Sequence, residues 1–411
     1  MPGAAPEGTS PVPVDGSLPT QVLDGAEHRR LGVYVHVPFC RVRCGYCDFT
    51  TYTAEELGPE AGASRAGYPA GVRDELALAG RVLDGAGLPP RRASTVFLGG
   101  GTPTLLPAED VVGLLRAVED AVGLEPGAEV TTEANPDSVD RDYLYRLAEG
   151  GFTRISLGVQ SAVPHVLATL DRTHDPERVP QVVGWAREAG LAVSVDLIYG
   201  TPGESAEDWR ASLDLAVSLH PDHVSGYALV VEAGTRMAVQ VRRGELALPD
   251  DDDLADKYEV AEEVLSTAGL GWYEVSNWAR GAEHACRHNL GYWRGDDWWG
   301  VGPGAHSHVG GVRWWNVRHP SAWARAVHAG RSPAQGREVL APAERAAEDV
   351  LLRSRLSEGL PVASVAPRQR GEVAVLVSDG LLDDGAARAG RVVPTLRGRL
   401  LADVVARSLT G

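Results

Sequence analysis

The chain has 411 residues, which is enough for one large domain and one or two smaller ones. Its 39 lysine and arginine residues are outnumbered by 56 aspartate and glutamate residues, and the net charge of -17 argues against a general affinity for nucleic acid or anionic membranes. Its four cysteines do not form the disulfide framework of a small secreted protein and no run of about 18 apolar residues could span a membrane, so we expect a protein of the reducing cytoplasm.

The first thirty residues differ in composition from the rest of the chain. Residues 1–30 are rich in proline, glycine and acidic residues, and they contain no apolar segment of the kind that a signal peptide carries. We therefore expect them to form a disordered leader.

From residue 31 onward, short apolar runs alternate with longer amphipathic stretches, a pattern that predicts βα units around a parallel sheet. The expected strands cover residues 31–37, 95–98, 129–133, 154–158, 192–198 and 223–227. The expected helices cover residues 72–83, 107–122, 141–149 and 176–188, after a long loop over 54–71. Six strands are too few for the complete eight-stranded barrel. We therefore predict an α/β fold with an open, partial (β/α)6 barrel of the TIM type over residues 31–240.

Two further regions are expected after the barrel. Residues 241–334 extend it, and the acidic run 250–253 is expected at a helix start, where negative charge complements the helix dipole. Residues 335–411 are expected to form a small C-terminal α+β domain similar to a winged-helix unit. Its expected elements are helices over 343–356 and 373–382, an extended piece over 391–394 and a last helix over 395–409. Because a fold does not imply a function, we expect a lid or docking surface here and no nucleic-acid role.

Three of the four cysteines follow the first expected strand within eight residues, as Cys40, Cys44 and Cys47. Thiolates in this spacing favour an iron-sulfur cluster, zinc or copper(I). Three thiolates cannot fill a four-ligand site, so a cubane cluster would keep one iron open to another molecule. The alternative is a structural zinc site completed by His36. We expect His36 to orient the loop instead, because a fourth protein ligand would close the open position.

Unusual residues recur where the next four expected strands end, in the strings Gly99-Gly100-Gly101-Thr102, Glu133-Ala134-Asn135-Pro136, Gly158-Val159-Gln160-Ser161 and Asp196-Leu197-Ile198-Tyr199-Gly200. Each string alone is typical of a cap or a turn. Parallel sheets place their ligands at the carboxyl ends of the strands. The repetition of such strings beside the cysteine loop therefore predicts a ligand cavity.

The cysteine spacing, with the aromatic Tyr46 before the last cysteine, resembles the radical S-adenosylmethionine superfamily. The strings YVHVPFC, FLGGGTPTLL, TEANP, ISLGVQS and VDLIYGTPGES look like the oxygen-independent coproporphyrinogen III oxidase family, over about residues 31–411. The resemblance implies a radical S-adenosylmethionine barrel in which Cys40, Cys44 and Cys47 bind a 4Fe-4S cluster and S-adenosylmethionine binds the fourth iron. It also implies that this cofactor is held by Tyr34, Tyr46, Gly100, Gly101, Thr102, Glu133, Gln160, Arg172 and Asp196.

The chemistry of three of these side chains fits that role. Glu133 and Asp196 are acceptors suited to an ammonium group or ribose hydroxyls, and Arg172 carries the planar donor fork suited to a carboxylate.

Two departures from the oxidase pattern indicate a different branch of this family. Phe49 stands two residues after Cys47, where the decarboxylating enzyme has a fourth cysteine, and His288-Asn289-Leu290-Gly291-Tyr292-Trp293 matches an H-N-x-x-Y-W signature that looks like the heme-chaperone branch. The resemblance implies heme as a further cofactor, heme-accepting proteins and an electron donor as partners, and it leaves a homodimer open. The rival is coproporphyrinogen III oxidation itself, so enzymatic activity is left open.

His288 is the candidate axial ligand of the heme iron, with Cys286 nearby. Many aromatic residues surround it in the sequence and could stack on a porphyrin: Trp272, Tyr273, Trp278, Tyr292, Trp293, Trp298, Trp299, Trp314 and Trp315. The residues alone favour a different interpretation, because a histidine-asparagine pair amid aromatics is more often a hydrogen-bonded core feature. Cys286 lacks the C-x-x-C-H arrangement of covalent heme attachment, and His306 is left unassigned.

Overall fold

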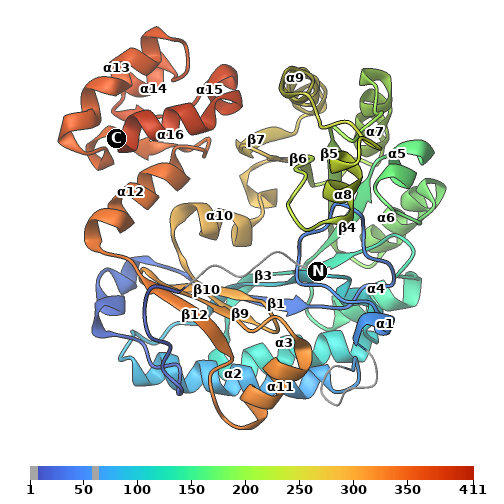
Figure 1. The fold of residues 1–411 in the computed structure, drawn as a ribbon, viewed down its shortest axis with the longest axis vertical. Coiled ribbons are helices and arrows are strands. Elements are labelled where there is room, and N and C mark those ends of the chain that lie inside the picture. The colour runs from blue at the N-terminus through green and yellow to red at the C-terminus, as the bar shows by residue number, and fades with distance from the viewer. Residues whose placement is uncertain (1–7, 58–63) are drawn as a thin grey trace.

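The computed structural model describes residues 8–57 and 64–411. Its centre is a curved, mostly parallel sheet with helices on its outer side (Figure 1). The first half of the chain contributes the strands β1 Leu31–Val37, β2 Ala93–Gly100, β3 Leu124–Ala134, β4 Arg154–Gln160, β5 Ala192–Tyr199 and β6 His223–Ala228. These six strands are neighbours in chain order and run parallel, which confirms the expected α/β partial barrel.

The helices of the first half connect these strands and cover the sheet. They are α1 Ala54–Leu57, α2 Tyr68–Gly85, α3 Ala108–Val122, α4 Arg141–Glu149, α5 Pro164–Thr169, α6 Val179–Glu188 and α7 Ala206–Ser218. The four expected helices are confirmed. Short 3-10 turns add Thr20–Leu23, Ala26–His28, Pro103–Leu105 and Pro176–Arg178.

The prediction of a long loop over residues 54–71 is wrong at both ends of that range. A helical turn forms at Ala54–Leu57, where the backbone N–H of Thr53 donates to Glu56 Oε2 at 2.8 Å, and residues 58–63 lie outside the described part. The helix α2 begins at Tyr68 because that side chain is buried against Phe39 and Trp323 and donates its hydroxyl to the His36 carbonyl at 2.7 Å.

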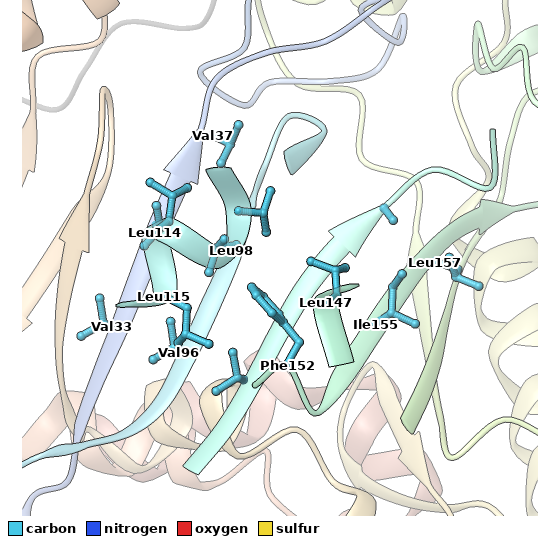
Figure 2. Packing of buried hydrophobic residues seen from close by; sticks show 14 of the residues in the cluster. Val33, Val37, Val96, Leu98, Leu114, Leu115, Leu147, Phe152, Ile155 and Leu157 are labelled. Atoms are coloured by element: carbon cyan, nitrogen blue, oxygen red, sulfur yellow. The ribbon is translucent and has the colours of Figure 1, made fainter. Parts of the chain in front are cut away.

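Side chains alternate between the two faces of the barrel strands. On the outer face, Val33, Val96 and Ile155 pack with helix residues such as Leu114 and Leu147 in one buried cluster (Figure 2). On the inner face the alternate positions are mostly polar: Tyr34 on β1, Thr131 and Glu133 on β3, Ser156 on β4, Ser194 and Asp196 on β5, and Ser225 on β6. The apolar face therefore holds the helices, while the polar face is left for a ligand.

The second half of the chain widens the sheet at both edges, which the sequence did not predict. Its strands are β7 Gly271–Glu274, β8 Asn277–Ala279, β9 Asp297–Val301, β10 His306–Val309, β11 Val312–Asn316 and β12 Ala334–Val339, and its helices are α8 Arg236–Arg242, α9 Asp251–Thr267, α10 Arg287–Arg294 and α11 Pro320–His328. The sheet order over the described residues is β12-β11-β10-β9-β1-β2-β3-β4-β5-β6-β8-β7. The acidic helix start is confirmed, since Asp250 caps α9 by accepting from the backbone of Asp252 and Asp253.

The predicted disordered leader over residues 1–30 is wrong for the part that the structure describes. Residues 1–7 lie outside it, but from residue 8 the chain runs along the sheet edge. The backbone N–H of Ser10 donates to the carbonyl of Arg337 on β12 at 3.0 Å, and Ser332 N–H donates to Val14 at 2.8 Å. Val22 is fully buried in the main core. Burial of this valine and pairing with an edge strand outweigh the disorder-prone composition of the segment.

The C-terminal region has its own core around Val350, Leu376 and Leu409 and lies apart from the barrel helices in Figure 1. Its elements are α12 Pro342–Arg353, β13 Leu360–Pro361, the 3-10 turns Val362–Ser364 and Pro367–Gln369, α13 Arg370–Ser378, α14 Asp384–Arg388, β14 Arg391–Val392, α15 Leu396–Leu400 and α16 Ala402–Thr410. The single last helix that we expected is instead two, because the backbone of Leu401 leaves the helical conformation. The boundaries at residues 31, 241 and 335 stay predictions. Among the described residues, no helix is both long and apolar enough to cross a membrane.

A buried carboxyl on α2 links this helix to the strands and the helix α11 of the second half of the chain. Glu75 accepts hydrogen bonds from the backbone of Gly302 at 2.8 Å and from Asn316 and Trp323 at 2.6 Å each. Burial raises the pKa of this carboxyl to about 7, against the lowering effect of these three donors.

The pH dependence of unfolding should reveal this carboxyl. Because its folded pKa is raised, its contribution to stability is complete below about pH 4.5 and is lost as the pH rises through about 7. Between pH 5 and pH 8 the wild type should lose on the order of 3 kcal/mol more stability than Glu75→Gln, whose amide does not titrate. Urea unfolding of both proteins at the two pH values measures this difference. Equal losses would show that Glu75 does not titrate in this range.

Candidate functional site

A cavity of about 660 Å³ lies inside the barrel. It is lined by the inner faces of β1 to β6, by the cysteine loop that follows β1, and by α10. All thirteen predicted site residues border it: Tyr34, Cys40, Cys44, Tyr46, Cys47, Gly100, Gly101, Thr102, Glu133, Gln160, Arg172, Asp196 and His288. Its volume suits one small-molecule ligand of ordinary cofactor size.

Hydrogen bonds to the strand ends fix the cysteine loop. The backbone N–H of Cys40 donates to the carbonyl of Tyr52 at 3.0 Å, and that of Thr102 donates to Phe39 at 2.7 Å. His36 Nε2 lies 2.8 Å from the Thr50 carbonyl, so this nitrogen is the donor, and Nδ1 accepts from the Tyr34 hydroxyl at 3.0 Å. Burial lowers the pKa of His36 to about 4. Both nitrogens are therefore engaged in this structure, as expected for a residue that orients the loop.

Two glycines at the end of β2 allow the strand to pass close to this loop. Gly100 has a φ of 104°, and a Cβ atom there would collide with the His36 ring. A Cβ on Gly101 would lie 2.5 Å from the carbonyl oxygen of Phe39. Any larger residue would push β2 away from the cysteine loop.

The three loop cysteines are free thiols at the same cavity wall. Burial raises the pKa of Cys40 to about 12 and that of Cys47 to about 11, with smaller contributions from the neighbouring thiols. Arg172 Nη1 lies 3.8 Å from Cys44 Sγ and is the nearby positive charge. A metal cluster would replace the three protons, because thiolates are the binding form. Soft donors gathered on one loop thus fit an iron-sulfur cluster.

Two half-buried carboxyls, Glu133 and Asp196, also border the cavity. Glu133 accepts from the backbone of Gly100 at 2.9 Å, and Asp196 accepts from the Ser156 hydroxyl at 2.9 and 3.0 Å. Burial, followed by the nearness of Asp196, raises the pKa of Glu133 to about 8, and burial also raises the pKa of Asp196. A cationic ligand would favour the ionised form of both carboxyls. This part of the cavity is therefore suited to an ammonium or sulfonium group.

Arg172 and Gln160 lie between the cysteines and the carboxyls. Arg172 Nη2 donates to Asn135 Oδ1 at 2.7 Å and to the carbonyl of Gly158 at 2.5 Å. Its buried Nε has no hydrogen-bond partner among the described residues, which leaves a donor for a carboxylate. Gln160 ends β4 with a φ of 62°, a conformation that costs a non-glycine residue energy and often marks a functional site.

The helix α10 closes the amino end of the barrel, opposite the cysteine loop. Cys286, His288, Asn289 and Tyr292 from this region border the cavity. His288 Nδ1 lies 2.8 Å from Thr95 Oγ1, near the start of β2, and Nε2 lies 2.8 Å from the Tyr292 hydroxyl. Burial lowers the pKa of His288 to about 3. Neither nitrogen is free to bind iron in this structure, so heme ligation by His288 stays a prediction that would require one bond to break.

The expected aromatic platform around His288 is not formed. Trp278, Trp299 and Trp315 are buried in the packing of the sheet, with exposed fractions of 0%, 4% and 4%. Of the nine aromatic residues expected there, only Tyr292 borders the cavity. The other tyrosine and phenylalanine residues that border the cavity come from the barrel strands and the cysteine loop: Tyr34, Tyr46, Phe49, Phe97 and Tyr227. These tryptophans lie on strands that the local sequence did not reveal, namely β8, β9 and β11, and their role is core packing.

The predicted set omitted many residues that border the cavity, among them Asn135, Ser156 and Tyr227. Asn135 directly follows β3 and holds Arg172, so its place after a strand end was a usable signal. Ser156 and Tyr227 are inner-face positions of β4 and β6, which the two-residue period of a strand would have found once the strands were assigned.

The sequence of this chain is similar to those of known proteins. The sequence profile of the Radical SAM superfamily matches residues 34–216. The heme chaperone HemW of Mycobacterium tuberculosis is 51% identical over 382 residues, which cover 92% of this chain and 95% of that protein. This chain belongs to the HemW family. The HemW proteins of Synechocystis and Escherichia coli are 36% and 34% identical, covering 84% and 80% of this chain and 82% and 84% of their own lengths.

Among solved structures, the coproporphyrinogen III oxidase HemN of Escherichia coli shares the fold. Its TM-score is 0.78 over 95% of this chain and 92% of that chain, at 22% identity. This likeness confirms the radical SAM architecture, whereas the family assignment rests on the HemW sequences. For a HemW family member, the radical SAM superfamily implies S-adenosylmethionine and a 4Fe-4S cluster, and the donors of the cavity fit both groups.

Proposed function

We propose that this protein is a cytoplasmic heme chaperone that binds heme and transfers it to acceptor proteins. The observation that carries this proposal is the 51% identity, over nearly the whole chain, to proteins named heme chaperones. The cavity supports it at one position. Phe49 borders the cavity two residues after Cys47, where the oxidase pattern places a fourth thiol.

The cluster and S-adenosylmethionine would share the cavity. Cys40, Cys44 and Cys47 would bind three irons, and Arg172 would meet the cofactor carboxylate through its unpartnered Nε. Glu133 and Asp196 would accept from its ammonium and ribose groups, with Tyr34, Tyr46, Gly100, Gly101, Thr102 and Gln160 closing around it. A cluster held by these cysteines would supply one-electron chemistry beside the sulfonium, and an electron donor would then be a further partner. The residues of the chain bind, orient and shield these groups.

Asp196→Asn tests the placement of S-adenosylmethionine. An amide keeps the size of the side chain but offers one acceptor fewer and no charge, so we expect the affinity for the cofactor to fall about tenfold, a loss typical of a charge-assisted hydrogen bond. The cluster should remain, because Asp196 forms no hydrogen bond to a cysteine among the described residues and accepts from Ser156. Equilibrium binding to the reconstituted protein measures the affinity. Asp384→Asn changes an exposed carboxylate of α14 and is the matched control. Unchanged binding by Asp196→Asn would remove this residue from the cofactor site.

Oxygen-independent coproporphyrinogen III oxidation is the rival function, because the HemN fold and the strand-end strings are shared. The two are distinguished by adding coproporphyrinogen III and S-adenosylmethionine to reduced, reconstituted protein, in parallel with a hemin titration. A heme chaperone binds hemin at a defined stoichiometry and forms no protoporphyrinogen IX. Formation of protoporphyrinogen IX at a catalytic rate would overturn the proposal.

A further inference from the structure

Exposed apolar side chains gather at the mouth of the cavity. Val42, Phe49, Tyr227 and Val230 all border the cavity, and their exposed fractions are 47%, 59%, 46% and 61%. We call these four residues the apolar rim. Large apolar side chains are normally scattered on a protein surface, and their concentration around one opening marks a binding surface.

The rim is one surface although it comes from two parts of the chain. Val42 and Phe49 belong to the cysteine loop, whereas Tyr227 is the last residue but one of β6 and Val230 follows the strand. The start of α8 joins the two parts, since the backbone N–H of Met237 donates to the carbonyl of Gly45 at 2.8 Å. Beside this joint, the exposed Arg236 pairs with Asp171 at 3.3 Å. The guanidinium of Arg236, paired with Asp171 and 69% exposed, thus lies near the contact between the two parts of the rim.

The interior of the cavity differs from its rim. Its walls carry the half-buried carboxyls Glu133 and Asp196 and the guanidinium of Arg172, and its inner end is closed by α10 with both His288 nitrogens engaged. A volume of about 660 Å³ suits one ligand of cofactor size. The walls of the cavity are thus polar and charged, whereas its rim is apolar and better suited to a flat, apolar macrocycle.

We propose that the apolar rim is the heme-binding surface of this protein, with the macrocycle lying across Phe49 and Tyr227 at the mouth. The inference rests on the proposed heme-chaperone function. A porphyrin matches this surface because it is large, flat and apolar, and it stacks on aromatic rings. Its propionates match the exposed guanidinium of Arg236. Heme held at an opening remains accessible to an acceptor, which a buried heme would not be.

Hemin titration of the reconstituted, full-length protein tests the rim. The double variant Phe49→Ser with Val230→Ser removes two exposed apolar side chains, so we expect the dissociation constant for hemin to rise at least tenfold. Iron and sulfide content, and the urea unfolding midpoint, should match the wild type because both side chains are exposed. Leu248→Ser is the matched control: Leu248 is 65% exposed but does not border the cavity, and its replacement should leave the affinity unchanged.

Three results would overturn the rim as the heme surface. The first is a double variant that binds hemin within twofold of the wild type. The second is normal hemin binding with lost transfer to an acceptor, which would assign the rim to the acceptor protein. The third is a loss of affinity confined to His288→Ala, which would place the heme at α10. The wild-type protein is titrated with hemin before any variant. If it binds no hemin at all, the proposed function itself is wrong.

Discussion

Replacing Cys44 with serine should abolish the iron-sulfur cluster. Cys44 is one of three thiols on the loop after β1, and Arg172 lies 3.8 Å from its sulfur. With two thiolates remaining, a cubane cluster would lose a ligand on a second iron, so we expect iron and acid-labile sulfide to fall to a small fraction of the wild-type content. Metal and sulfide analysis after anaerobic reconstitution, with the cluster absorption band, measures this loss.

The fourth cysteine is the matched control for this experiment. Cys286 is buried at α10, where its thiol lies 3.5 Å from Glu129 Oε1, and burial raises the pKa of that thiol far above its usual value. Cys286→Ser should therefore keep the full iron and sulfide content. Full content in Cys44→Ser, or its loss in Cys286→Ser, would refute the assignment of the cluster ligands.

Replacing Glu129 with glutamine should destabilise the fold strongly. This carboxylate on β3 accepts from the backbone N–H groups of Arg287 and His288 at 3.0 Å each, so it caps the start of α10. It also forms an ion pair with Arg154 at 3.5 Å, in which both side chains are only 5% exposed. Loss of one partner leaves a buried guanidinium without its counter-charge, which typically costs about 3–5 kcal/mol. Urea unfolding of Glu129→Gln measures the change, and a loss under about 1 kcal/mol would contradict this account.

Glu133 provides a comparison on the same strand and the same face. The Glu133 side chain lies near Asp196. Unlike Glu129, Glu133 forms no ion pair among the described residues. Because its folded pKa is raised to about 8, the contribution of the Glu133 carboxyl to stability is complete below about pH 4.5 and is lost as the pH rises through about 8. Glu133→Gln should therefore match the wild type near pH 4 and exceed its stability at pH 9. The two carboxyls, four residues apart, should thus respond in opposite directions to the same substitution.

The barrel could be predicted from the sequence because its signals are local. The six strands are short apolar runs with a two-residue alternation, and their chemistry falls at consecutive strand ends, where a parallel sheet gathers it. This reasoning placed Glu133 and Asp196 in the same cavity as the cysteines, as the structure confirms.

The added strands could not be predicted in the same way, because their pairing depends on residues distant in sequence. The strand β9 pairs with β1, so Leu31 lies opposite Asp297, and the Asp297 carboxylate meets Arg29 at 2.9 Å and Arg91 at 2.6 Å. Nothing near Asp297 in the sequence reveals these partners. Trp299 consequently resembled part of a porphyrin surface although it is a core residue.

Phe49 could be interpreted only in part from the sequence. Its identity indicated the branch of the family, but its exposed place on the apolar rim depends on how the cysteine loop folds against β6 and α8. His288 shows the reverse, since its motif indicated a heme ligand while its two hydrogen bonds are visible only in three dimensions.

Heme transfer tests the central claim most directly. The reconstituted protein is loaded with one equivalent of hemin and mixed with increasing amounts of a heme-free b-type cytochrome, and the rate at which the cytochrome spectrum develops is recorded. For a chaperone, we expect the heme to pass to the cytochrome at a rate that rises with cytochrome concentration, because the acceptor takes heme from an accessible surface. A rate independent of cytochrome concentration would indicate passive release, and it would contradict the proposed function.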